Sequence, residues 1–317
     1  MYAMPTSDQT AVWIDDADAD TWGVHYLSFD PLEDDSFETD SFGNVLAAAY
    51  NPANEAVWIL GEYIQAVSRE KRAFVGIPFP EDGLVPFDLK QIGHYIYLCC
   101  AQANVWAFNR TINTWEPRLQ PGPKPDIPSR DAAETAADYV DRTYPMMDRY
   151  AMDNPGTYGA FGSGDAHYVV GALGRVIRWR GDTPDQMWLD SGVRLIHGHD
   201  EDGQIVLCGD RPVAEIYRGT MDDGFELIFT DDERALHMTA RQGGVRYIGA
   251  GIDEEYDGPG LFRLEDGELI PEVTGCAREP GQLLQLVSTG AVLWAIDQGG
   301  IFRLVDGEWQ LTEFEDI

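Results

Sequence analysis

The chain has 317 residues, 44% of them hydrophobic, and its 55 acidic and 22 basic side chains give a formal net charge of −33. Such a charge repels nucleic-acid phosphates and anionic lipid and attracts cationic partners, so we expect neither a nucleic-acid nor a membrane partner.

No apolar run reaches the roughly 18 residues of a membrane span, and the first residues do not resemble a secretory signal. We read Cys99, Cys100, Cys208 and Cys276 as reduced core thiols and expect a cytoplasmic protein.

The predicted elements recur along the chain as pairs of linked strands. The pair near the end is a strand from Gly300, an Asp306-Gly307 turn and a second strand. The segment that starts at Gly260 has nearly the same sequence. In chain order, the apolar strand of each pair contains Trp13, Trp58, Tyr97, Tyr168, Val206, Tyr247 or Trp294. The strand that follows ends near Leu27, Val67, Phe108, Trp179, Tyr217, Leu264 or Leu304.

The spacing of these pairs predicts the fold. Five of the six intervals lie between 38 and 47 residues, which is the period of a four-stranded propeller blade, and the sixth is 71 residues. We therefore predict an all-β protein, a single β-propeller domain over residues 1–317 with seven four-stranded blades. The first blade is irregular, because its innermost strand must come from residues 1–9 or be missing. If its hairpin packs elsewhere, six blades remain.

The long interval contains a predicted insertion, residues 121–157, between blades 3 and 4. Its start is rich in proline, and Asp131 and Glu134 have the spacing of a capping box before an Ala-rich stretch. These patterns predict a helix that runs through about Arg142 and ends at Pro145. Long insertions on rigid scaffolds are disproportionately functional, although packing onto the propeller would explain the aromatic content of this one equally well.

The candidate partner-binding residues lie on one predicted face. In a propeller, the loops between second and third strands and the connections between blades emerge together. The acidic loops on this face contribute Asp16, Asp18, Asp20, Asp231, Asp232, Asp253, Glu254, Glu255 and Asp257, and the insertion contributes Tyr139, Tyr144 and Tyr150. The opposite face also carries acidic turns, at residues 33–35, 200–202 and 222–223, so a surface that is acidic only for solubility is the alternative.

Motifs for catalysis or metal binding fail on inspection. Asp16, Asp18 and Asp20 begin like a calcium loop, but the positions that require glycine and glutamate hold Thr21 and Leu27. His197 and His199 lie two apart near a turn, which is more typical of surface residues than of a metal site. We therefore predict no catalytic residue, no metal ion and no cofactor.

One run resembles a known group of blades. Residues 166–181 contain Tyr168-Val169-Val170-Gly171 and Ile177-Arg178-Trp179, and resemble the blades of bacterial sialidase-like or YVTN-type propellers. The resemblance implies a propeller and no particular activity. The Asp-box of true sialidases is not present in its usual form and no arginine triad is recognisable, so that family's catalysis is not carried over.

Two classes of function follow from these patterns. The first is a non-enzymatic binding protein, monomeric in isolation, which resembles in size and charge the bacterial immunity proteins that neutralise basic toxin domains. The second is an enzyme or lectin that acts on a glycan or a small molecule in the central funnel. We favour the first, with a basic protein as the partner, because no catalytic motif survives inspection.

Overall fold

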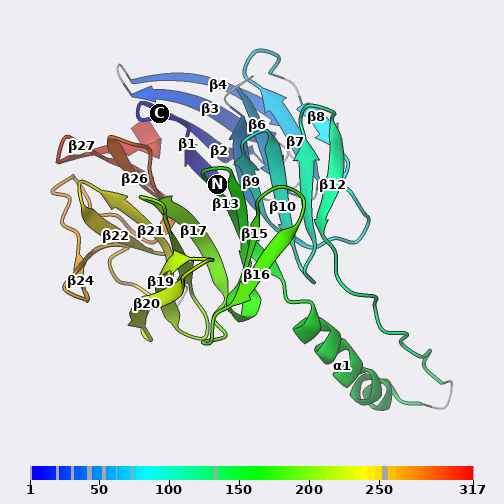
Figure 1. Cartoon of the computed structure of the whole chain (residues 1–317). Coiled ribbons are helices and arrows are strands. Elements are labelled where there is room, and N and C mark those ends of the chain that lie inside the picture. Colours follow the sequence, from blue (N-terminus) through cyan, green and yellow to red (C-terminus); the bar gives the residue numbers. More distant parts are fainter. Residues whose placement is uncertain are drawn as a thin grey trace.

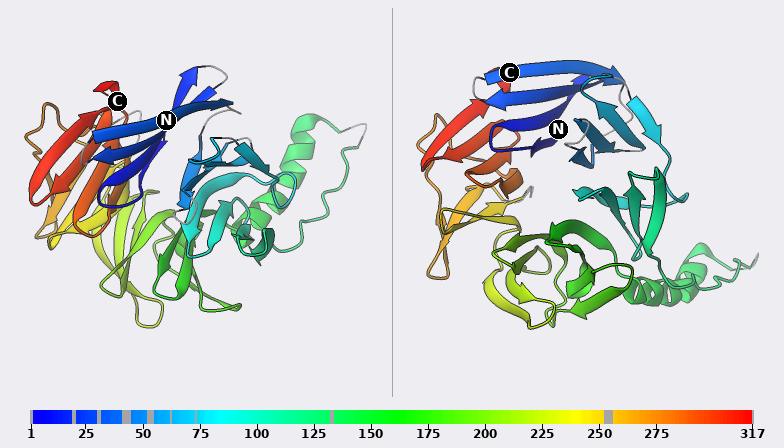
Figure 2. Two further views of the ribbon diagram at one scale, coloured as in Figure 1. Left: turned by 90° about the horizontal axis from the view of Figure 1, so that it is seen from above. Right: turned by 45° about the horizontal axis from the view of Figure 1, so that its top comes forward.

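Seven antiparallel sheets of four strands each form a ring in the computed structural model (Figure 1, Figure 2). The structure describes residues 2–18, 21–29, 32–40, 45–51, 55–61, 63–72, 74–131, 134–251 and 256–316. Each sheet is one blade built from four consecutive strands, with its first strand at the centre of the ring. The predicted seven-bladed all-β propeller is therefore confirmed, and the six-bladed alternative is wrong because β1 to β4 complete a blade of their own.

The strand bounds follow the blades in chain order. Blades 1 to 3 are β1 (Tyr2–Pro5), β2 (Thr10–Asp18), β3 (Thr21–Phe29) and β4 (Leu32–Asp40); β5 (Ala47–Asn51), β6 (Ala56–Leu60), β7 (Ile64–Ser68) and β8 (Phe74–Ile77); and β9 (Pro86–Ile92), β10 (Tyr95–Cys100), β11 (Val105–Asn109) and β12 (Thr114–Leu119). Blades 4 and 5 are β13 (Thr157–Ser163), β14 (Ala166–Gly171), β15 (Arg175–Trp179) and β16 (Pro184–Trp188); and β17 (Leu195–Glu201), β18 (Gln204–Gly209), β19 (Ala214–Thr220) and β20 (Gly224–Asp231). Blades 6 and 7 are β21 (Leu236–Gln242), β22 (Val245–Ala250), β23 (Leu261–Glu265) and β24 (Glu268–Pro271); and β25 (Leu283–Ser288), β26 (Val292–Asp297), β27 (Gly300–Val305) and β28 (Glu308–Glu313). Short 3-10 helices span Ala172–Gly174 and Phe314–Asp316.

Both strands of the repeated pair fall where the spacing places them. The apolar strands, from Trp13 to Trp294, are the second strands of the seven blades, and the strands that follow are the third strands. The innermost strand of the first blade comes from residues 1–9, as β1. Each of the two repeated strand patterns therefore marks the same strand in every blade, the second strand for one pattern and the third strand for the other.

Alternating side chains on the middle strands fill two different cores, one on each side of a blade. In β10, Leu98 and Cys100 pack with Trp58 of the preceding blade, whereas Cys99 packs with Val169 of the following one. This is the period-two pattern of a strand that is buried on both faces. The vicinal cysteines thus point to opposite faces, and both are free buried thiols.

The ring closes between blade 7 and blade 1 through side chains, because the two blades exchange no strand. Trp13 stacks on Phe314 with 4.3 Å between ring centroids, within a core that also contains Trp294. The Arg303 guanidinium donates to the backbone oxygen of Asp8 at 3.1 Å, and the Asp8 carboxylate accepts from the Thr289 hydroxyl at 2.8 Å. Ring closure therefore depends on one apolar core with polar contacts beside it.

The helix of the insertion, α1 (Ala136–Asp153), is longer than predicted and projects from the ring (Figure 1). Its capping box is formed by Thr135 and Asp138, rather than by Asp131 and Glu134. The prediction that Pro145 ends the helix is wrong, because contacts beyond the proline hold the last turns. Asn154 donates to the Tyr150 carbonyl from both its backbone and its side chain, and its Oδ1 accepts from the Gly122 N–H at 2.7 Å.

Within the described ranges, no helix is long and apolar enough to cross a membrane.

The two sides of the ring follow from the strand order. Since strands alternate in direction within a blade, the loops between second and third strands emerge on the side where the blade-to-blade connections lie. We call this side, which carries the 121–157 insertion, the insertion face.

Loss of the closure core should destabilise the whole ring. We expect Trp13→Ala to lower the free energy of unfolding by about 3–5 kcal/mol, because it removes a large buried side chain that the neighbouring blade cannot replace. Urea denaturation followed by circular dichroism measures this difference. Trp188→Ala on the outer strand β16, where the side chain is 46% exposed, is the control and should cost less than half as much. Equal losses in the two variants would contradict the role of Trp13 in closure.

Candidate protein-binding site

The seven innermost strands enclose a central channel of about 1130 Å³. Its mouth on the insertion face is shaped by a β-bulge that recurs in blades 3 to 7. In each of these blades the pairing between first and second strands skips one residue. A bulge leaves its extra residue unpaired and redirects the side chain. The five residues skipped, all of which line the channel, are Phe87, Tyr158, Ile196, His237 and Leu284. We call this set the bulge rim.

Apart from His237, the bulge rim is apolar and aromatic, and part of it is exposed. Phe87 is 39% exposed, and its ring lies 4.7 Å from that of Tyr158 in a tilted contact. The Arg194 guanidinium lies 5.4 Å from the centre of the Tyr158 ring, in a cation–π contact. Aromatic side chains held in this way lose little conformational freedom when they bind a partner, so they are suited to anchor an interface.

Ion pairs behind the rim fix its position. The Asp210 carboxylate accepts from Arg194 Nε at 2.8 Å and lies 3.3 Å from His237 Nε2. Burial alone would raise the pKa of Asp210, but hydrogen bonds from His237 and Arg194 outweigh it and hold the pKa at about 2. Gly251 is required beside this cluster, because a Cβ there would lie 1.7 Å from His237 Nδ1.

The acidic candidates occupy different environments. Asp232 and Asp257 are exposed on the insertion face. Asp231 is buried, and its carboxylate accepts from the Glu233 and Arg234 N–H groups and pairs with the Arg234 guanidinium, so it stabilises the turn. Asp20, Asp253, Glu254 and Glu255 lie outside the described residues, as do the side chains of Asp16 and Asp18. Among the acidic candidates whose side chains are described, Asp232 and Asp257 are therefore the exposed ones.

The three tyrosines of the insertion also differ in exposure. Tyr144 is 63% exposed, whereas Tyr150 is only 6% exposed and is therefore buried. Tyr139 is half-buried, with the Arg142 guanidinium 5.4 Å from the centre of its ring. Of the three, Tyr144 is the side chain that a partner could cover.

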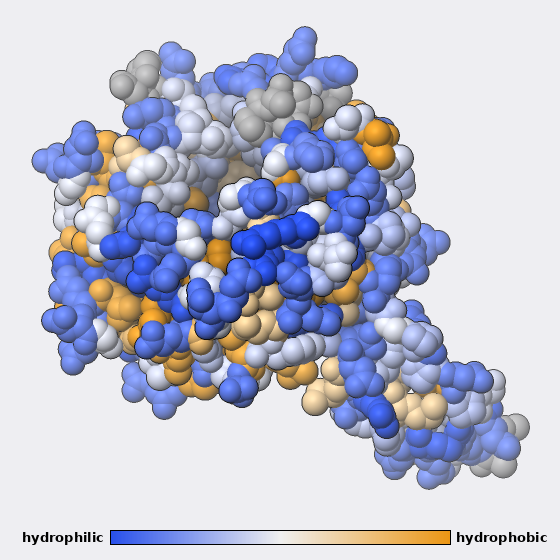
Figure 3. Space-filling view, viewed as in Figure 1, coloured by the Kyte–Doolittle hydropathy of each residue, from blue (hydrophilic) through white to orange (hydrophobic). Residues whose placement is uncertain are grey.

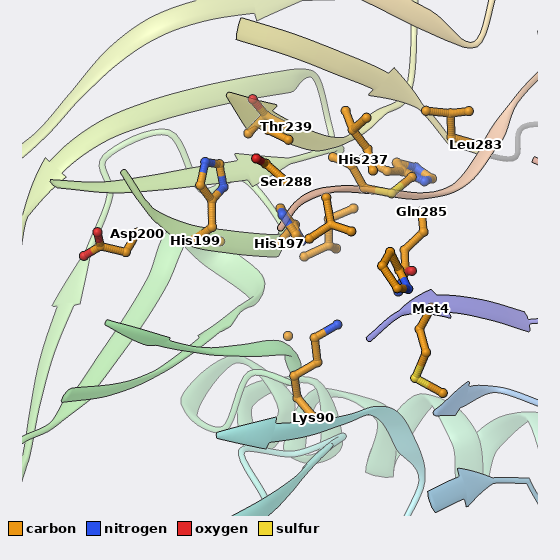
Figure 4. Close-up of a pocket in the computed structure, with 18 of the residues that line it drawn as sticks. Met4, Lys90, His197, His199, Asp200, His237, Thr239, Leu283, Gln285 and Ser288 are labelled. Atoms are coloured by element: carbon orange, nitrogen blue, oxygen red, sulfur yellow. The ribbon is translucent and has the colours of Figure 1, made fainter. Parts of the chain in front are cut away.

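His197 and His199 line the channel instead of lying on the outer surface, so that expectation is wrong (Figure 4). Ring closure brings their strand, β17, to the centre of the molecule. Burial lowers the pKa of His197 to about 3 and that of His199 to about 4, and the proximity of the two rings, 5.8 Å between centroids, adds to the effect at His197. Figure 4 shows Lys90 reaching toward them from across the cavity.

Among the described residues, no group of three or more His, Cys, Asp or Glu side chains could hold a metal ion. The acidic triplet that begins with Asp16 lies outside that search, because its side chains are not described. The absence of a bound metal or cofactor therefore stays a prediction, which elemental analysis of the purified protein can test.

Comparisons with known proteins establish the fold. No protein-family model matches the chain, and neither does any curated protein, so the specific resemblance to sialidase-like or YVTN-type blades has no family match. Many solved structures do match. The β-propeller domain of Cps50 (Swd1) from Myceliophteria thermophila is 13% identical with a TM-score of 0.56, over 93% of this chain and 94% of that one.

Two other solved structures show the same likeness. The β-propeller domain of the Trilobed protease from Pyrococcus furiosus, described as having an open velcro topology, is 11% identical with a TM-score of 0.58, over 99% of this chain and 96% of that one. YCF48, solved with a D1 peptide bound, is 11% identical with a TM-score of 0.52, over 85% of this chain and 82% of that one. At these identities the likeness concerns the propeller fold alone.

The buried channel histidines predict a pH dependence of stability. A base whose pKa is lower in the folded state binds its proton less readily there, so acid favours the unfolded chain. Each such histidine should remove at most about 1.4 kcal/mol of stability per pH unit as the pH falls from 6.5 toward its folded pKa. We expect His199→Gln to abolish its share, so that wild type loses about 2 kcal/mol relative to the variant between pH 6.5 and pH 5.

Urea denaturation at a series of pH values measures this difference. The matched control is His94→Gln, at an exposed position outside the channel. Parallel stability curves for wild type and His199→Gln across this range would show that His199 is not held neutral by burial.

Proposed function

We propose that the protein is a protein-interaction propeller that binds a basic partner on the insertion face. The observation that carries this proposal is the arrangement of that face, where the bulge rim provides an apolar centre with the exposed aromatic ring of Phe87. Asp232 and Asp257 are exposed in loops of the same face, and helix α1 projects outward from the connection between β12 and β13 on that side (Figure 2). Protein interfaces commonly have this composition, with aromatic anchors at the centre and polar groups at the edge.

The distribution of charge supports a basic partner. Several of the basic side chains are engaged in ion pairs across blade boundaries, where Arg178 pairs with Asp222 and Glu201 pairs with Arg246. Among the described residues, the buried acids are Glu201, Asp210, Glu215, Asp231 and Asp297, so the net charge of −33 lies mainly at the surface. Such a field accelerates encounter with a basic protein and weakens as salt is added, while the apolar anchors supply most of the affinity.

In its more specific form, the proposal is that the partner is a basic toxin domain and that this chain neutralises it. The support is an analogy of size and charge with bacterial immunity proteins, and the propeller supplies a rigid scaffold for blocking a partner's surface. An acidic inhibitor of this kind would bind without catalysis and would need no cofactor.

A second candidate is a small hydroxyl-rich molecule or glycan segment bound in the channel. The observation that favours it is His199, whose two ring nitrogens are buried without a hydrogen-bond partner in the cavity wall. The side-chain oxygens of Gln91 and Gln285, on the same wall, are unpaired in the same way. Hydroxyl groups could satisfy all of these atoms. A thermal-shift screen with sugars, compared between wild type and His199→Ala, tests this candidate.

The main proposal predicts that binding depends on the charge of one face. We expect Asp232→Lys combined with Asp257→Lys to weaken the native partner at least tenfold at low salt, because both charges lie on the insertion face. Phe87→Ala should weaken it by a similar factor through loss of an anchor. Capture from the native cell identifies the partner, and titration calorimetry with the purified pair measures affinity.

The matched control reverses two exposed acids on the opposite face, Asp165→Lys with Asp182→Lys, which changes the net charge equally. This variant should bind almost as tightly as wild type. If the captured protein is acidic, or if the two double reversals weaken it equally, the assignment of the insertion face is wrong.

A further inference from the structure

Helix α1 carries a continuous apolar stripe on its exposed side. Val140 is 53% exposed, Tyr144 63% and Met147 39%, and the exposed alanines Ala137 and Ala151 extend the stripe in both directions. These five residues, the apolar seam, follow one another at intervals of three, four, three and four. That is the spacing by which one helix presents a single face to another in a coiled coil. Figure 3 shows exposed apolar residues on this projection among hydrophilic ones.

The seam is exposed because a different side of α1 makes the contacts within the insertion. Thr143 and Tyr150 are the buried residues of the helix. The chain before α1 runs alongside it, and it is tied to the ring end of the helix by the bond from Gly122 to Asn154. At the outer end, Arg142 donates from Nε to Glu134 Oε1 at 2.9 Å. The helix is thus held at both ends while its apolar seam remains uncovered.

The charges beside the seam select the partner. Asp141 directly follows Val140 in the sequence, and Asp148 directly follows Met147. Both aspartates therefore flank the seam on the same side, and both are exposed. In coiled coils, residues at these flanking positions pair with opposite charges on the facing helix. Resting on the proposed function, we infer that α1 docks an amphipathic helix of the basic partner, with apolar residues against the seam and Lys or Arg beside Asp141 and Asp148.

A second copy of this chain fits the seam poorly. Two α1 helices packed antiparallel would place the aspartates of one copy beside those of the other, and like charges there oppose association. In a parallel pair, the residues facing Asp141 and Asp148 would be Ala136 and Thr143, neither of which carries a positive charge, and Thr143 is buried. Each chain also carries a net charge of −33. The seam is therefore complementary to a basic helix rather than to itself.

The test uses designed peptides of three heptads with the full-length protein. In every heptad, the probe peptide carries Leu at the two positions that face the seam (a and d) and Lys at the two positions that flank it (e and g). A second peptide carries Glu in place of Lys, and a third is a scramble of the Lys peptide. Fluorescence anisotropy measures binding, and the scramble measures non-specific attraction to the net charge. We expect the Lys peptide to bind at least tenfold more tightly than the scramble and the Glu peptide not to bind.

Variants of α1 locate the contact. Tyr144→Ala with Met147→Ala should weaken the Lys peptide at least tenfold, whereas Met152→Ala, an exposed apolar position away from the seam at 58% exposure, should leave binding unchanged. Asp141→Lys with Asp148→Lys should reverse the preference toward the Glu peptide. Circular dichroism of each variant confirms that the fold is retained.

Two outcomes would overturn the inference: equal binding of the Lys peptide and its scramble, or equal loss in the seam variant and Met152→Ala. Self-association of the wild type at micromolar concentration that Tyr144→Ala abolishes would instead assign the seam to a second copy. Failure of this inference is distinguishable from failure of the proposed function. The proposed function is tested by the loss of native-partner binding in Phe87→Ala and in the double reversal of Asp232 and Asp257, and none of these substitutions lies in α1.

Discussion

The packing of each blade against the next is the interaction on which the rest of the molecule depends. A four-stranded sheet with two apolar faces is not stable alone, and here every blade buries one face on each neighbour. The boundary between blades 7 and 1 must form without covalent continuity of a sheet. Trp13, Phe314 and Trp294 provide that boundary, so one aromatic core maintains the geometry of the whole channel.

A rigid ring explains how simple bulges become a binding surface. In five of the seven blades, one extra residue in the innermost strand turns a side chain toward the channel mouth. Because blade packing sets the positions of these strands, side chains as far apart in sequence as Phe87 and Leu284 share one rim. The insertion adds a helix at the periphery without altering any blade, so scaffold and binding elements are separable.

The sequence predicts much of the fold because the repeat is local. Each blade contains its own apolar second strand and third-strand anchor, so seven copies of one pattern, from Trp13 to Trp294, identify seven blades. The extent of α1 depends instead on the distant contact between Asn154 and Gly122, which local helix rules do not include. The bulge rim has no local signal either, since the residues skipped include Phe87, Ile196 and His237, three different chemical types. The spacing of His197 and His199 is typical of surface residues, because the pattern of one strand does not reveal what the closed ring encloses.

The strand order also bears on how the chain folds during synthesis. Every sheet consists of four consecutive strands, so a blade has all of its strands once its own fourth strand has left the ribosome. In a ring closed by an exchanged strand, one blade must wait for the other end of the chain. Here each completed blade can dock on its predecessor while translation continues, and domains of this kind generally fold as units from the N-terminal end. The apolar faces of each blade, which would otherwise stay exposed and invite aggregation, are thus covered early, and the final event is the meeting of Phe314 with Trp13.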